Sequence, residues 1–106
     1  MYEPLKIKQS VGEDIKLEDI PLEGGTALIP EYEDYNERDT LDVYIENEKV
    51  VTRHNLRNPI DGYFAVLIPK DAFLRNLGAE RKFKYVIFLR GINPVTSETA
   101  LFNLHL

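Results

Sequence analysis

Short segments in which apolar and polar residues alternate recur along this chain, and they constrain its fold more than any other feature. Alternation with a period of two places one set of side chains on each face of a strand. Turn-forming residues separate the segments, and helical spacing occurs only in residues 70–77. Such spacing is typical of an antiparallel sandwich or barrel rather than a parallel α/β sheet. The expected strands are residues 6–8, 26–29, 40–45, 48–54, 63–68, 82–90 and 97–106.

The connections between these segments carry recognisable turn chemistry. Glu46 and Asn47 separate two expected strands, and asparagine tolerates the left-handed conformation of a tight hairpin. Gly78 follows the helical segment, where a helix C-cap favours glycine. Residues 91–94 are expected to form a turn.

The alternation also predicts which side chains point inward. An antiparallel sandwich buries one face of each strand against the facing sheet. The expected core is Leu28, Leu41, Val43, Ile45, Val51, Phe64, Val66, Ile68, Phe83, Tyr85, Ile87, Phe102 and Leu104.

Length and hydropathy bound the organisation. The 106 residues, 43% of them hydrophobic, suit one domain spanning residues 1–106, with residues 1–13 as a loosely ordered lead-in. No apolar run approaches the roughly 20 residues of a membrane-spanning helix, so we expect no membrane insertion. We expect a cell-surface or secreted location if the chain is part of a larger protein, and a cytoplasmic one if it is full length.

Charge and cysteine content exclude several classes of function. The chain has no cysteine, which excludes disulfide scaffolds, thiolate metal sites and cysteine nucleophiles. Its net charge of −5 argues against nucleic-acid binding, even though Lys82, Lys84 and Arg90 share one face of a strand. Residues 1–48 hold 14 acidic and 4 basic residues, whereas residues 49–106 hold 4 and 9. Either the halves interleave, or opposite charges mediate head-to-tail contact between copies or neighbours.

Few residues suggest chemistry. His54 and His105 are too few to make a zinc site, and neither Ser10 nor Ser97 lies in a nucleophile elbow. We therefore expect no enzyme, no catalytic or metal-binding residue and no cofactor. The acidic loop of residues 31–39 is either a calcium site or simply a solvated loop, and it lacks the spacing of an EF-hand.

Several tyrosines could offer contact area to a ligand. Tyr32, Tyr35, Tyr44 and Tyr63 either present aromatic faces to sugar or protein, or pack at the rim of the core.

Residues 38–47 resemble the Asp-x-apolar-x-apolar-Tyr-x-x-Gly hairpin of bacterial immunoglobulin-like modules, found in proteobacterial (pseudomonad-type) surface or toxin-associated proteins. Residues 21–32 are similar to that family's Gly-Gly strand with a proline-tyrosine exit. Residues 64–69 resemble its apolar strand closed by proline, and residues 73–78 its short connecting helix. Asn47 departs from the family's usual turn glycine, and Ile45 stands where tryptophan is common.

The resemblance implies an immunoglobulin-like Greek-key β-sandwich of about seven strands with one short helix. It also implies a non-enzymatic structural or adhesive module that is part of a larger bacterial surface or secreted protein, with neighbouring domains or another protein as partner. One alternative is a carbohydrate- or small-ligand-binding module that uses the loops around Tyr32, Tyr35 and Asn58. A second is a small intracellular protein-interaction domain that acts through its charge asymmetry.

Overall fold

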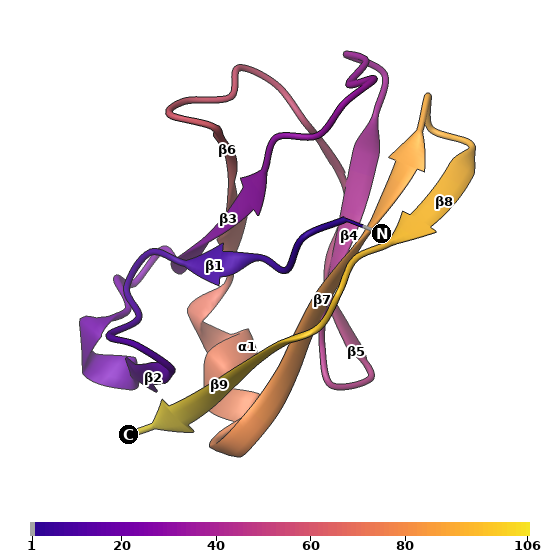
Figure 1. Ribbon diagram of the computed structural model, residues 1–106. Coiled ribbons are helices and arrows are strands. Elements are labelled where there is room, and N and C mark those ends of the chain that lie inside the picture. Colours follow the sequence, from indigo (N-terminus) through magenta and orange to yellow (C-terminus); the bar gives the residue numbers. More distant parts are fainter. Residues whose placement is uncertain (1) are drawn as a thin grey trace.

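The computed structural model describes residues 2–106 as two β-sheets that face one another (Figure 1). The smaller sheet has the antiparallel order β1 (Lys6–Ile7), β3 (Gly25–Pro30) and β6 (Tyr63–Ile68). The chain is therefore mostly β and sandwich-like, as the alternation predicts.

The larger sheet supplies most of the molecule. Its order is β2-β9-β7-β4-β5, and β8 also pairs with β7. Neighbouring strands are antiparallel except β2 and β9, which are parallel. The bounds are β2 (Asp14–Lys16), β4 (Thr40–Ile45), β5 (Glu48–Asn55), β7 (Gly78–Leu89), β8 (Asn93–Thr96) and β9 (Ala100–His105).

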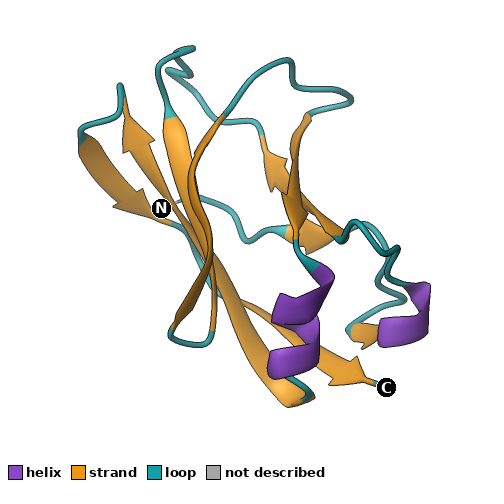
Figure 2. Ribbon diagram, turned by 180° about the vertical axis from the view of Figure 1, so that it is seen from behind, coloured by secondary structure: helices purple, strands orange, loops and turns teal. Residues whose placement is uncertain are grey.

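Two short helices lie at the same end of the sandwich (Figure 2). A 3-10 turn, η1 (Leu17–Asp19), follows β2, and α1 (Lys70–Arg75) links β6 to β7. The ring of Phe73 in α1 lies so close to Gly25 of β3 that a Cβ on Gly25 would come within 2.8 Å of two ring atoms. Glycine at this position therefore lets the helix close one end of the core.

Most of the expected core is confirmed, and it lies between the sheets. Two expected members, Leu28 and Val51, are only half-buried. Leu28 was placed on the wrong face of its strand, since Ala27 and Ile29 are the residues of β3 that point inward. Core residues that the alternation did not predict are Leu5, Ile7, Ile15, Ile20, Ala27, Ile29, Leu56, Ala72 and Phe73.

Several element boundaries differ from expectation. The helix ends at Arg75 with Asn76 as its C-cap, and Gly78 instead opens β7, which starts four residues earlier than Lys82. The expected turn at residues 91–94 overlaps β8, and the last strand starts at Ala100 rather than residue 97.

The β4–β5 turn also differs in detail, because Glu46 rather than Asn47 has positive φ. Within residues 2–106, no helix has the length and apolar character needed to cross a bilayer.

Candidate interaction surfaces

The acidic loop, residues 31–39, joins β3 to β4 and is organised by one buried carboxylate. Asp39 has no exposed surface. Its Oδ2 accepts hydrogen bonds from the Tyr32 hydroxyl (2.6 Å) and the Asn36 backbone N–H (3.1 Å). Its Oδ1 accepts one from the Arg90 backbone N–H (2.7 Å). Asp39 therefore fastens both ends of the acidic loop to each other and to the end of β7.

The remaining acids of this loop, Glu31, Glu33, Asp34 and Glu37, are exposed. Across residues 2–106, no three His, Asp or Glu side chains are grouped so that they could hold a metal ion. Asp39 thus holds the acidic loop in place, and the exposed carboxylates give this loop a negatively charged surface.

Tyr32 and Tyr35 are half-buried, and their hydroxyls anchor the acidic loop. The Tyr35 hydroxyl donates to the Leu56 carbonyl (2.6 Å), and its ring lies 4.9 Å from that of Phe64. Tyr32 stacks on Tyr2 with ring centroids 4.9 Å apart. Burial raises the pKa of Tyr32 far above its ordinary value, and the hydrogen bond to Asp39 adds to this shift. Both hydroxyls are therefore already used inside the fold.

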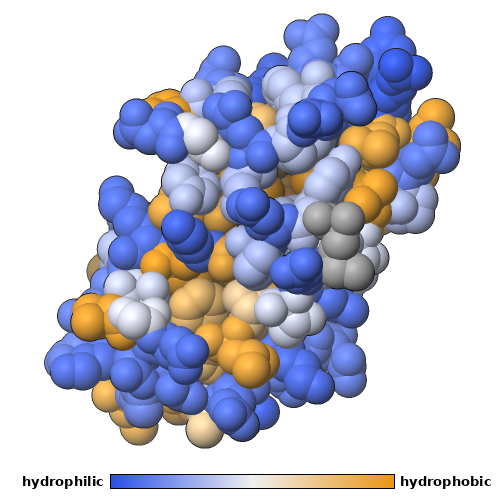
Figure 3. Space-filling model, viewed as in Figure 1, coloured by the Kyte–Doolittle hydropathy of each residue, from blue (hydrophilic) through white to orange (hydrophobic). Residues whose placement is uncertain are grey.

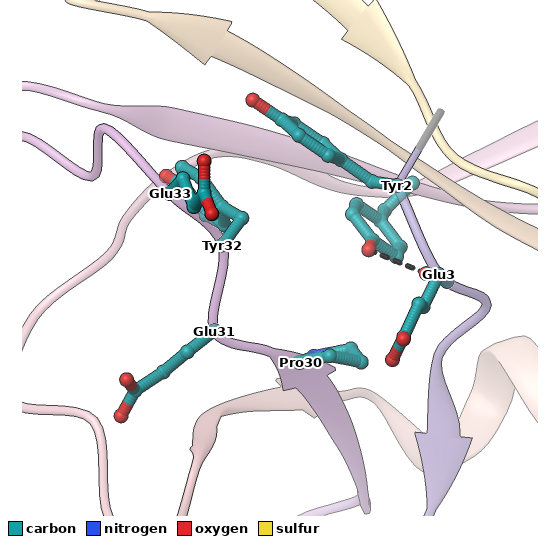
Figure 4. A pocket seen from close by; sticks show the side chains of 7 residues that line it. Tyr2, Glu3, Pro30, Glu31, Tyr32 and Glu33 are labelled. Carbon is teal, nitrogen blue, oxygen red and sulfur yellow. Dashed lines mark hydrogen bonds between the residues drawn. The ribbon is translucent and has the colours of Figure 1, made fainter.

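A shallow hollow of about 450 Å³ lies beside these rings (Figure 4). Its lining comes from the segment before β1, from the end of β3 with the residues after it, and from Tyr85 of β7. The Tyr85 hydroxyl donates to the Glu3 carbonyl (2.6 Å), and burial raises the pKa of Tyr85 above its ordinary value. In Figure 4 the Glu3 and Glu31 carboxylates lie on different sides of the hollow. The lining residues are Tyr2, Glu3, Pro30, Glu31, Tyr32, Glu33 and Tyr85.

A second hollow, of about 640 Å³, brings together two of the residues expected to serve a ligand. Tyr35 and Asn58 both line it, together with Glu37, Arg38, Asn55 and Arg57. Tyr32 lines the first hollow instead, so the three residues proposed as one loop site are divided between two hollows.

The outer face of the larger sheet carries cations held over aromatic rings. The Tyr44 ring on β4 lies between two lysines, with Lys84 Nζ at 5.3 Å and Lys49 Nζ at 5.9 Å from its centroid. The Arg53 guanidinium lies 3.6 Å from the Phe88 ring centroid. These distances are those of cation–π contacts. We call Tyr44, Lys49, Arg53, Lys84 and Phe88 the cationic face.

A buried aspartate beneath the cationic face determines how its cations are placed. Asp42 is only 2% exposed, and its Oδ1 accepts a hydrogen bond from the Arg53 backbone N–H (2.7 Å). Arg53 has φ +47°, and the β4–β5 register shifts between Leu41 and Val43. Lys49 Nζ lies 3.4 Å from Asp42 Oδ2. One carboxylate thus holds the irregularity of β5 that turns Arg53 toward Phe88.

The histidines and serines do not come together in one site. His54 is exposed on β5, directly after Arg53 of the cationic face. His105 Nε2 is 3.0 Å from Asp14 Oδ1, a contact that, with the Asn103 amide, lowers the pKa of Asp14. Ser97 Oγ accepts a hydrogen bond from the Tyr85 backbone N–H and donates to a carbonyl. Ser10 Oγ also donates to a backbone carbonyl.

Sequence reasoning found the cationic face only in part. The alternation of residues 82–90 indicated Lys84 and Phe88, and hairpin pairing could have placed Lys49 beside Tyr44. No sequence signal indicated Arg53, because a left-handed arginine within a strand depends on the buried partner below it.

Figure 3 shows a view of the molecule that is mostly hydrophilic, with separate apolar patches. One patch lies over the β7–β8 hairpin, where Ile92 is 74% exposed.

The comparisons with known proteins were without result. No family model matches the chain, and no curated protein or solved structure matches it.

Proposed function

We propose that the chain is a non-enzymatic structural or adhesive module that binds another protein through its cationic face. The observation that carries this proposal is the set of three cations held over two aromatic rings on a chain of net charge −5. Tyrosine, phenylalanine and arginine supply the anchors of many protein interfaces. A positive face on an acidic molecule selects an acidic partner and speeds its approach.

The position of this face on strands supports the proposal. Tyr44 and Lys84 are paired neighbours on β4 and β7, which are central strands of the larger sheet. Side chains on such strands lose little further freedom on binding, so more of the contact energy is realised as affinity. The hydroxyls of Tyr32 and Tyr35, by contrast, already donate hydrogen bonds within the fold.

We also propose that the module is immunoglobulin-like and belongs to a bacterial surface or secreted protein; a cytoplasmic location is expected instead if the chain is complete. The strand order supports the first part. The chain passes from β3 in the smaller sheet to β4 and β5 in the larger, back to β6, and again to β7 and β9. Such crossing between sheets is a feature of Greek-key sandwiches.

Binding to an acidic polypeptide tests the proposed function. Immobilised protein should bind poly-L-glutamate, and added salt should weaken the binding because the contact is electrostatic. The double variant Lys49→Ala with Lys84→Ala should bind roughly tenfold more weakly, since two charge contacts at the ring are lost.

A matched control removes two exposed lysines elsewhere. The variant Lys8→Ala with Lys16→Ala has the same net charge and should bind like wild type. Equal loss in both variants would show that only overall charge matters and would contradict a defined docking face.

A carbohydrate- or small-ligand-binding function is the second candidate, favoured by the polar hollow that joins Tyr35 and Asn58. A ligand for this hollow should raise the melting temperature by mass action. A panel of free sugars should stabilise wild type and not Asn58→Ala if this candidate holds; an unchanged melting temperature across the panel would contradict it.

A further inference from the structure

The cationic face and the acidic loop each carry charged side chains that have no ion-pair partner among the described residues. Within residues 2–106, the ion pairs are Lys49–Asp42, Arg75–Glu48 and His105–Asp14. In that part of the chain, Lys84 of the cationic face therefore has no carboxylate within 4.0 Å, and neither Glu33 nor Glu37 of the acidic loop has a cation within that distance.

The acidic loop is too far from the lysine end of the cationic face, Tyr44 with Lys49 and Lys84, for the two to neutralise one another within one copy. The other end of the face differs, because Phe88 pairs with Thr40 and so lies beside the acidic loop. The acidic loop leads directly into Thr40 at one end of β4, whereas Tyr44 lies near the other end, beside the β4–β5 turn (Figure 1). Four strand residues separate them by about 13 Å. This exceeds the roughly 8 Å over which exposed charges interact at physiological salt.

The acidic loop is also prepared for contact. It is fastened at Tyr32, Tyr35 and Asp39 by hydrogen bonds of 2.6 to 3.1 Å, so its exposed carboxylates are displayed on a fixed connection. The acidic loop therefore loses little further conformational entropy when a partner binds.

We propose that the acidic loop of one copy docks on the cationic face of the next. This inference rests on the proposed function and names its partner as a second copy of the chain. The contact is heterologous, because two different surfaces meet, and it leaves one free surface at each end of a pair. Copies, or adjacent modules of this type, would then associate head to tail in a salt-sensitive manner.

Exchange of charges between the two surfaces tests this inference. One variant, Lys49→Glu with Lys84→Glu, reverses the cationic face; the other, Glu33→Lys with Glu37→Lys, reverses the acidic loop. Each substitution changes the charge by two, so the net charges move from −5 to −9 and from −5 to −1. Both variants stay acidic overall, so general attraction cannot bring them together.

Sedimentation velocity over a concentration series gives the readout. Wild type should associate beyond its 12.3 kDa monomer at about 20 mM salt and dissociate at about 500 mM. Each reversed variant should be monomeric alone, and an equimolar mixture should regain association. A control at −9, Lys8→Glu with Lys16→Glu, should associate like wild type, because its two surfaces are intact.

Wild type that stays monomeric at low salt, or a face-reversed variant that still associates alone, would overturn the inference. A mixture that fails to associate would do the same. Binding of poly-L-glutamate by wild type separates the two proposals: if it persists, only the identity of the partner is wrong, and if it is absent, the proposed function fails as well.

Discussion

Two buried aspartates, Asp39 and Asp42, shape the surfaces on which this account depends. Each accepts hydrogen bonds from backbone N–H groups, which compensates for the removal of a carboxylate from water. Asp39 holds the acidic loop and Asp42 holds the irregular part of β5. Sequence alternation placed Asp42 on the outer face of β4, but it could not show that neighbouring side chains would cover it.

Asp39→Asn should destabilise the fold. An amide nitrogen would replace one of two oxygens that both accept hydrogen bonds, so at least one buried donor would lose its partner. The expected loss is about 1–3 kcal/mol in urea unfolding. Asp34→Asn, at an exposed position of the same loop, should change stability by less than about 0.5 kcal/mol. Equal effects would contradict the anchoring role.

Alkaline pH should weaken the fold through Tyr32 and Tyr85. The pKa of each lies above its ordinary value of 10.0 in the folded state, mainly because of burial. The unfolded chain therefore loses these protons first, so the contribution to stability is complete below about pH 10 and is lost as pH rises toward the folded pKa. Urea unfolding should show this decline beginning near pH 10 and continuing above it.

The double variant Tyr32→Phe with Tyr85→Phe provides the comparison for that decline. Its stability should fall less steeply over the same pH range, because the two shifted groups are gone. Identical slopes in wild type and variant would mean that other groups cause the alkaline loss.

At the scale of elements, the bounds and the inward face of a strand were predicted best where the strand has one clear apolar face. β4 and β6 begin and end at the predicted residues. β3 was predicted with the wrong face inward, because both faces carry apolar residues and the smaller Ala27 fits the interior. β2 buries only Ile15 and depends on parallel pairing with β9, which no local pattern indicates. Asn93 and Pro94 were predicted to lie in a turn, yet they pair with β7 at the sheet's edge.

The β4–β5 hairpin should loosen locally when Asp42, which accepts a hydrogen bond at the irregular part of β5, is removed. Asp42→Ala leaves the Arg53 N–H without its 2.7 Å acceptor and releases Lys49. Hydrogen exchange should become faster in β5, while the β7–β9 pairing keeps its protection. Unchanged exchange at Arg53 would show that the irregularity does not depend on the aspartate.

At the scale of the whole molecule, the acidic and basic halves of the sequence interleave. β4 of the first half lies between β5 and β7 of the second, and each ion pair found within residues 2–106 joins one half to the other. The two-sheet class followed from strand spacing and turn chemistry, which are local properties. The cationic face could not be predicted from local properties, because it combines residues from β4, β5 and β7 that only the sheet register brings together. The acidic loop was recognised from composition alone, but its fastening through Asp39 required the tertiary structure.

Nuclear magnetic resonance titration tests the central claim most directly. Amide chemical shifts of ¹⁵N-labelled protein would be followed as poly-L-glutamate is added at low salt. We predict that the largest changes occur at Tyr44, Lys49, Arg53, Lys84 and Phe88 and that they disappear in the variant Lys49→Ala with Lys84→Ala. Changes centred on the loop hollows instead, or spread evenly over exposed lysines, would contradict a docking role for the cationic face.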